Sequence, residues 1–151
     1  MKSKLHALVG SIALLCIGTF WTSTLVSELL LDQGSVVAVK NAILAAMWLL
    51  IPAMAATGAS GFGLARSRAG RLVQEKQRRM KVIAANGLLI LLPSAFFLAR
   101  MANTEQFDAT FYAVQGLELI AGAVNITLLC LNMRDGLRIS GRLAPRRHAR
   151  P

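Results

Sequence analysis

The chain has 151 residues, of which 55% are hydrophobic and only 16% are charged. Soluble domains usually contain about 45–50% apolar and about 25% charged residues. A membrane-spanning helix needs about 20 mostly apolar residues, so this composition allows roughly four spans and leaves little for a soluble domain. These values exclude a globular enzyme with a membrane tail, and they exclude an intrinsically disordered chain.

Four long apolar runs follow one another along the sequence. Each exceeds the roughly 18 residues that a spanning helix requires, and none alternates apolar and polar residues as the strands of a membrane barrel do. We therefore predict an all-α, four-helix transmembrane bundle that forms a single domain over residues 1–142. The predicted helices cover about 5–31, 36–65, 80–101 and 110–133, and a disordered basic tail is predicted over residues 143–151.

The basic residues predict the topology. Fifteen of the 17 Lys and Arg residues lie near the N-terminus, in residues 66–81 or after residue 133, whereas only Lys40 and Arg100 belong to the other two connections. By the positive-inside rule, both termini and residues 66–81 are cytoplasmic in a bacterial inner membrane, and the turns near Asp32 and residues 105–108 face outward. Topology and contact with lipid headgroups explain the net charge of +10, so we expect no nucleic-acid partner, with an acidic partner as the alternative.

The N-terminus also has features of a secretory signal, because Lys2 and Lys4 precede an apolar stretch. The apolar run continues past Trp21 to Leu31, and no Ala-x-Ala-like site lies at the usual place. We therefore expect this segment to remain as the first spanning helix.

Polar and small residues at helical spacing predict which face of each helix points into the bundle. The second run carries small residues, which allow close helix approach in lipid and predict a homodimer through this face. In the third run, Asn86, Pro93 and Arg100 recur at intervals of seven residues. The other predicted lining residues are His6, Gly10, Ala13, Ile17, Thr24 and Glu28 in the first run, Ala42, Ala46, Ala55, Ala59 and Gly63 in the second, and Gln115, Glu118, Gly122, Asn125 and Asn132 in the fourth.

Glu118 is the most informative of these residues. An ionisable group inside a membrane costs several kcal/mol unless it is paired or hydrated. Arg100 lies on the preceding antiparallel run at a similar depth, so we predict a Glu118–Arg100 ion pair that also involves Gln115 and Tyr112. This pair either holds two helices together or belongs to an outward-facing pocket that Thr24, Glu28 and Trp21 also line, in which case the chain is a small-molecule carrier or binding protein.

His6 and Met54 suggest a different chemistry. A histidine at a helix start can bind haem iron, and a glycine one turn later, Gly10, leaves room for the porphyrin plane. Met54 is the candidate for the second axial ligand, as in His/Met cytochromes. The alternative is a capping histidine and an ordinary packing methionine. No motif of a soluble enzyme is present, so the sequence assigns no catalytic residue.

These residues also carry a resemblance to a known family. Leu5-His6 at the start of the first run, and Pro52-Ala53-Met54 followed by Thr57 and Gly58 in the second, resemble the haem-b-containing bacterial protoporphyrinogen oxidase family and its small four-helix membrane relatives. The resemblance covers the first two helices and implies an inner-membrane bundle in which His6 and Met54 hold haem b.

Three functions are thus open. The leading hypothesis is a small b-type haem redox protein that exchanges electrons with a quinone or a tetrapyrrole. The second is a carrier or binding protein that uses the polar pocket around Glu118, and the third is a structural subunit without chemistry.

Overall fold

The computed structural model describes residues 2–66 and 70–139. It contains α1 (Lys2–Leu30), α2 (Gln33–Arg66), α3 (Arg71–Asn86), a π-helical turn η1 (Gly87–Leu91), α4 (Leu92–Asn103) and α5 (Ala109–Ile139). Four crossings are long and apolar enough to span a membrane, because α3, η1 and α4 together form one of them. The predicted all-α, four-helix transmembrane bundle is confirmed, and the chain is a multi-pass membrane protein.

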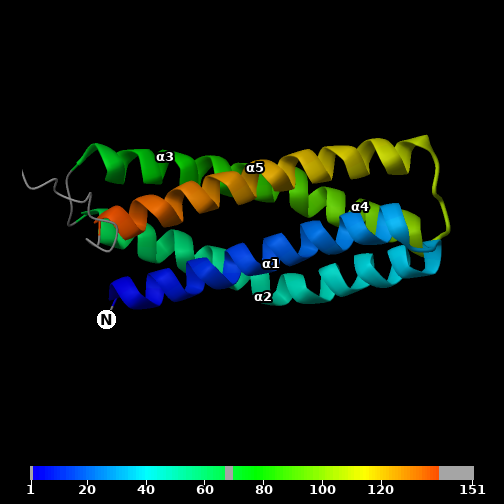
Figure 1. The fold of residues 1–151 in the computed structure, drawn as a ribbon, viewed down its shortest axis with the longest axis horizontal. Helices are drawn as coiled ribbons and strands as arrows, with labels where there is room; N and C mark the ends of the chain where they lie inside the picture. Colours follow the sequence, from blue (N-terminus) through cyan, green and yellow to red (C-terminus); the bar gives the residue numbers. More distant parts are fainter. Residues whose placement is uncertain (1, 67–69, 140–151) are drawn as a thin grey trace, which may run out of the picture.

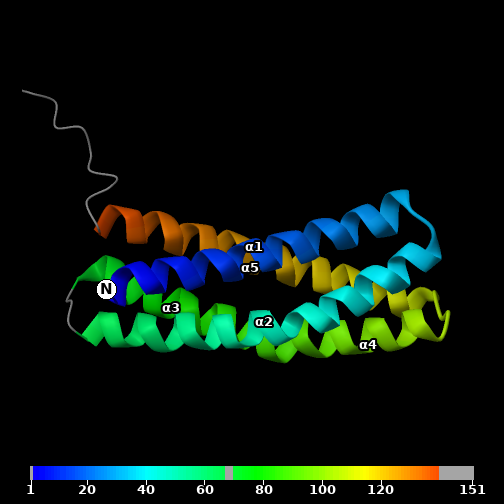
Figure 2. The same ribbon diagram turned by 90° about the horizontal axis from the view of Figure 1, so that it is seen from below.

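The four crossings run alternately in opposite directions (Figure 1). We call the end where α1 begins and α5 ends the terminal end, and the end with the turns at residues 31–32 and 104–108 the loop end. α1 packs against α2 and α5, and the third crossing packs against the same two helices. Within the described residues, α2 and α5 have no close backbone contact, so they occupy opposite corners of the bundle (Figures 1 and 2).

The bundle buries polar and small side chains and exposes large apolar ones. Trp48 is 85% exposed, and Leu30 and Leu89 are each 76% exposed. Such a surface fits lipid, because in lipid the interior is distinguished by its polar groups. The buried polar or charged residues are Thr24, Ser27, Lys40, Thr57, Ser94, Gln115, Asn125, Asn132 and Asp135.

Aspartates begin the two helices that leave the loop end. The backbone N–H of Ser35 donates to Asp32 Oδ1 over 3.1 Å, and the backbone N–H groups of Thr110 and Phe111 donate to Asp108 Oδ1 over 2.9 and 3.0 Å. These bonds satisfy N–H groups that have no partner inside their own helices. The hydroxyl and backbone hydrogen bonds from Ser35 lower the pKa of Asp32 below its usual value.

Two helices extend six or more residues beyond their predicted bounds, and the other helix ends lie within three residues of the prediction. α3 begins at Arg71 instead of residue 80, and α5 continues to Ile139 instead of residue 133. Much of residues 66–81, expected to form a loop, is therefore helical. Arg, Lys, Gln and Glu favour helix, and Glu75 pairs with both Arg71 and Arg79 at a spacing of four residues. The predicted tail at residues 143–151 lies outside the described residues.

The π-helical turn changes which residues of the third crossing face inward. The backbone N–H of Leu92 bonds to the Gly87 carbonyl, five residues back, directly before Pro93, which has no N–H of its own. This turn adds one residue, so the seven-residue spacing is interrupted after Asn86. Pro93 and Arg100 are exposed, and the next residues in the chain, Ser94 and Met101, are buried instead. The predicted inward face is therefore right for Asn86 and wrong for Pro93 and Arg100.

The predicted inner faces of α1 and α5 are confirmed, because all their proposed lining residues are buried or half-buried. For α2 the prediction is wrong for most residues. Ala46 is half-buried, but Ala42, Ala55, Ala59 and Gly63 are exposed, and the buried stripe runs instead through Val36, Lys40, Ile43 and Met47. A lysine costs far more in lipid than an alanine does, so α2 is rotated to place Lys40 inside. The small residues now face outward, and the homodimer through them stays a prediction.

Candidate functional site

The charges of the third crossing indicate where the hydrocarbon core lies along the bundle. Lys81 and Arg100 bound residues 82–99, which carry no charge, and this segment is close to the about 20 residues, or about 30 Å, that span the hydrocarbon. Val36, Met101 and Phe111 pack in one apolar cluster, so they mark the boundary near the loop end on three crossings.

A group of charged and amide side chains lies inside this boundary. Lys40 and Gln115 are each four residues further along their helices than Val36 and Phe111, which places them roughly 6 Å deeper. By the same count, Glu118 lies roughly 10 Å beyond the boundary. Ionisable groups at such depth are rare in membrane proteins and mark functional sites by default.

Lys40 is the centre of this group. Its Nζ donates to Gln115 Oε1, and to Glu118 Oε2 over 3.1 Å, and it lies 4.0 Å from Glu28 Oε1. Gln115 Nε2 in turn donates to Glu118 Oε2 over 3.2 Å. The side chain of Lys40 is only 1% exposed, and those of Glu28 and Glu118 are 9% and 14% exposed. We call Lys40, Gln115, Glu118 and Glu28 the Lys40 cluster.

The Lys40 cluster lies at the centre of the bundle because the Lys40 side chain extends from α2 to Gln115 and Glu118 on α5, at the opposite corner. α2 and α5 are diagonal neighbours, so only a long side chain can join them. Helical side chains point toward the N-terminus of their own helix. Lys40 and Glu118 therefore lean toward the loop end, whereas Glu28, on α1, leans away from it, and the three groups converge.

The Lys40 cluster corrects the predicted partner of Glu118. The structure brings together Gln115, Glu118 and Glu28 from the predicted set, but the cation beside them is Lys40 and not Arg100. Arg100 is exposed and makes no ion pair within the described residues. The π-helical turn rotates it out of the bundle, and its place at the hydrocarbon boundary lets its long side chain reach the polar headgroups.

Trp21 lies directly against the helix that carries Glu118. Its indole Nε1 donates to the Leu119 carbonyl over 2.9 Å. A Cβ at Gly122 would lie only 2.9 Å from Trp21 Cδ1, so this glycine provides the space for the indole ring. The indole ring of Trp21 thus fills the contact between α1 and α5 at Gly122, which lies one helical turn along α5 from Glu118.

Asn86 and Asn125 form a second polar contact toward the terminal end, beside η1. Asn86 Nδ2 donates to Asn125 Oδ1 and to the Ala121 carbonyl, both over 2.8 Å. Asn125 Nδ2 donates to the Ile83 carbonyl over 3.4 Å. Their side-chain amides bond to each other and to backbone, which is the expected role of asparagine between membrane helices.

The structure does not bring His6 and Met54 together. His6 Nδ1 lies 2.9 Å from Ser60 Oγ, whereas Met54 packs in an apolar cluster around Ile17. Met54 precedes Ser60 by six residues, roughly 9 Å along α2, whereas two ligands with bonds of about 2 Å lie about 4 Å apart. The two residues therefore do not fit as axial ligands of one haem within this chain.

The space beside Gly10 is also narrow. A Cβ there would lie 3.7 Å from Thr57 Cγ2, so α2 occupies the place that the sequence assigns to the porphyrin plane. Within the part of the chain that the structure describes, no group of three or more His, Cys, Asp and Glu side chains could hold a metal ion. Haem b stays a prediction that neither residue's surroundings support.

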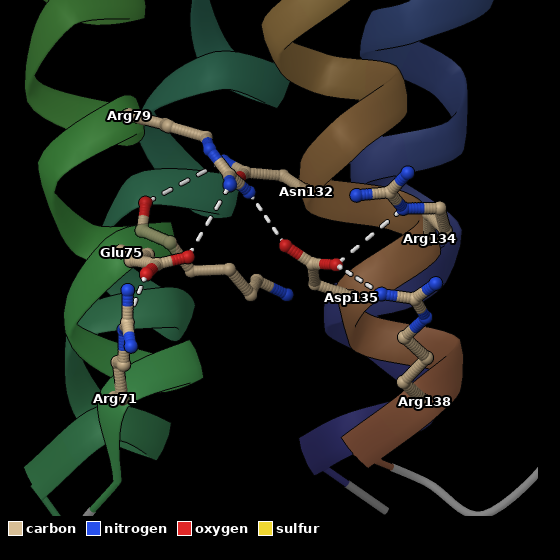
Figure 3. A network of polar contacts seen from close by, with 8 residues as sticks. Arg71, Glu75, Arg79, Asn132, Arg134, Asp135 and Arg138 are labelled. Carbon is tan, nitrogen blue, oxygen red and sulfur yellow. Dashed lines mark hydrogen bonds and ion pairs between the residues drawn. The ribbon is translucent and has the colours of Figure 1, made fainter. Parts of the chain in front are cut away.

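A second charged network joins α3 and α5 near the terminal end (Figure 3). Arg79 donates to the buried carboxylate of Asp135 over 2.6 Å and lies 3.5 Å from Glu75, which also pairs with Arg71. Arg134 and Arg138 lie 3.6 and 3.8 Å from the second oxygen of Asp135. This network holds the two helices together, because its shortest contact joins Arg79 on α3 to Asp135 on α5.

Sequence reasoning missed Lys40 and Asp135. The distribution of Lys and Arg assigns Lys40 to the connection between the first two helices, although it lies inside the second apolar run. Asp135 follows Asn132 by three residues and so continues the polar stripe of α5, but the predicted helix ended at residue 133. Extending the stripe by one turn would have identified Asp135.

Comparison with known proteins adds no assignment. No family model, no curated protein and no solved structure matches this chain.

Proposed function

We propose that the chain is a small carrier or binding protein of the bacterial inner membrane, with the Lys40 cluster as its solute site. The observation that carries this proposal is a third ionisable group, Glu28, beside the buried Lys40–Glu118 pair. One pair supported by Gln115 is enough to hold helices together. A second carboxylate adds a buried charge that packing does not require.

The energetic cost of the cluster supports a functional role. Buried ion pairs often contribute little net stability, because desolvation offsets their attraction, and apolar residues of similar volume can replace them. Ionisable groups within membrane helices commonly mark solute or ion pathways. A cluster with both signs of charge and an amide offers donors and acceptors to a polar solute.

The position of the cluster fits a carrier that opens outward. The positive-inside rule places the loop end outside and both termini in the cytoplasm. Solute would then reach the Lys40 cluster from the loop end, while the Arg79–Asp135 pair holds α3 and α5 together at the terminal end. A carrier needs a site that is accessible from one side and closed on the other.

Tryptophan fluorescence tests the proposal. The chain has two tryptophans, and Trp48 is 85% exposed toward lipid, so Trp48→Phe leaves Trp21 as a reporter beside α5. The purified protein is titrated with the chlorides of sodium, potassium and tetramethylammonium, with sodium acetate and with glycine. We expect a saturable change in Trp21 emission with one class of solute.

Two variants show whether the titrated solute binds at the Lys40 cluster. The response should disappear in Glu28→Gln, which removes the carboxylate beside the Lys40–Glu118 pair, and persist in Arg100→Met, whose arginine is exposed and lies outside the cluster. A response shared by both variants would place the solute elsewhere. No saturable response to any solute would favour the structural subunit over the carrier.

A further inference from the structure

The Lys40 cluster carries more negative than positive formal charge. Glu28 and Glu118 are two carboxylates, and Lys40 is one ammonium group. Lys40 and Glu118 are also the charged groups that act on Glu28 from the neighbouring helices α2 and α5. With both carboxylates ionised, the cluster would hold one excess negative charge inside the membrane, where an uncompensated charge is costly.

The two carboxylates are held very differently. Glu118 Oε2 accepts hydrogen bonds from Lys40 Nζ over 3.1 Å and from Gln115 Nε2 over 3.2 Å. Glu28 Oε1 is buried and has no hydrogen-bond partner within the described residues, and Lys40 Nζ is 4.0 Å away. The Glu28 side chain is 9% exposed, so bulk water does not solvate it fully. Glu28 Oε1 is therefore the atom at which a further positive charge is missing.

We propose that Glu28 binds a proton which a monovalent cation displaces, so that the site exchanges one cation for one proton. This inference rests on the carrier function proposed above and names the class of its solute. In one state the Glu28 carboxylic acid holds the proton, and in the other the O–H bond breaks, the proton leaves to water and the cation lies beside the carboxylate.

Charge neutrality selects a monovalent cation. With Lys40 and Glu118 paired, the cluster is neutral both when Glu28 is protonated and when its carboxylate faces one monovalent cation. A divalent cation would leave an excess positive charge, and an anion would add to the negative charge. Both would raise the cost of holding the occupied site within the hydrocarbon.

Proton release measures this exchange directly. Purified protein in weakly buffered detergent solution with a pH-indicating dye receives sodium, potassium or tetramethylammonium chloride. We expect the release of about one proton per chain from the wild type, since one carboxyl group changes its protonation state. Glu28→Gln has nearly the same shape and no titratable proton, so it should release none.

A matched control separates the site from general effects of salt. Glu75→Gln changes a carboxylate near the terminal end that is 40% exposed, and it should release protons as the wild type does. Circular dichroism and gel filtration establish that each variant is folded. Release by sodium or potassium identifies an inorganic cation, and release by tetramethylammonium alone identifies an organic ammonium ion.

The other outcomes overturn the inference in distinguishable ways. Equal release from the wild type and Glu28→Gln would place the proton on another group. A saturable Trp21 response to acetate or glycine, with no proton release by any of the three cations, would refute the exchange and leave the carrier standing. The absence of both proton release and a Trp21 response would refute the exchange and the proposed function together.

Discussion

Replacing Lys40 by methionine tests the structural role of the Lys40 cluster. The substitution keeps a long unbranched side chain and removes the ammonium group that the structure places beside Glu28 and Glu118. Removing one partner of a buried pair typically costs about 3–5 kcal/mol, because the other charge stays buried and unpaired. Glu118 is 14% exposed, which favours the lower value, about 3 kcal/mol or a roughly 150-fold change in the unfolding equilibrium.

The assay is equilibrium unfolding of the purified protein in mixed detergent micelles, followed by circular dichroism at neutral pH. Arg100→Met is the matched control, because it removes an exposed cation from the same end of the bundle. Surface substitutions of this kind usually change stability by less than about 0.5 kcal/mol. Adding Glu118→Gln to Lys40→Met should recover most of the loss, because the remaining Glu28 can become neutral by binding a proton.

Equal stability of Lys40→Met and Arg100→Met would refute this reasoning. So would a larger loss from Arg100→Met, because the charge that compensates Glu118 would then be Arg100.

Two further predictions concern packing and pH. Gly122→Ala should destabilise the protein by about 1–3 kcal/mol, because its Cβ would lie 2.9 Å from Trp21 Cδ1, whereas at Gly116, which has open space, alanine should be neutral or stabilising in the same unfolding assay. Equal effects at the two glycines would contradict the close contact of α1 and α5. Hydrogen bonds from Ser35 lower the pKa of Asp32 in the folded state, so the stability that Asp32 contributes is present above its unfolded pKa and is lost as the pH falls through the folded pKa. An NMR titration of the Asp32 carboxyl carbon should show a low pKa that rises toward the usual value in Ser35→Ala, because the substitution removes the hydroxyl hydrogen bond and keeps the backbone one, and an unchanged value would contradict the role of the hydroxyl.

The sequence allowed the fold and the polar stripe of α5 to be predicted for a simple reason. Long apolar runs without alternation permit only helices in lipid, and Gln115, Glu118, Asn125 and Asn132 recur with the period of one helix face. These features depend on local spacing, which is visible in the sequence.

The partner of Glu118 could not be obtained in this way. It depends on the rotation of α2, which places Lys40 inside, and on the extra residue of η1, which turns Arg100 outward. Pro93 indicates a distortion of the third crossing, but not that the helix gains one residue there. The pairing of helices at diagonal corners is likewise a tertiary property.

The measurement that tests the account most directly is the Trp21 titration of the Glu28→Gln/Lys40→Met/Glu118→Gln variant in the Trp48→Phe background. This variant removes the ion pair and the Glu28 carboxylate together, so no charge is left buried without a partner, and loss of binding is separated from loss of stability. The account predicts a folded protein with stability near that of its parent and no saturable response to the solute that the parent binds. A response equal to that of the parent would contradict it, because the Lys40 cluster would then serve only to pack the helices.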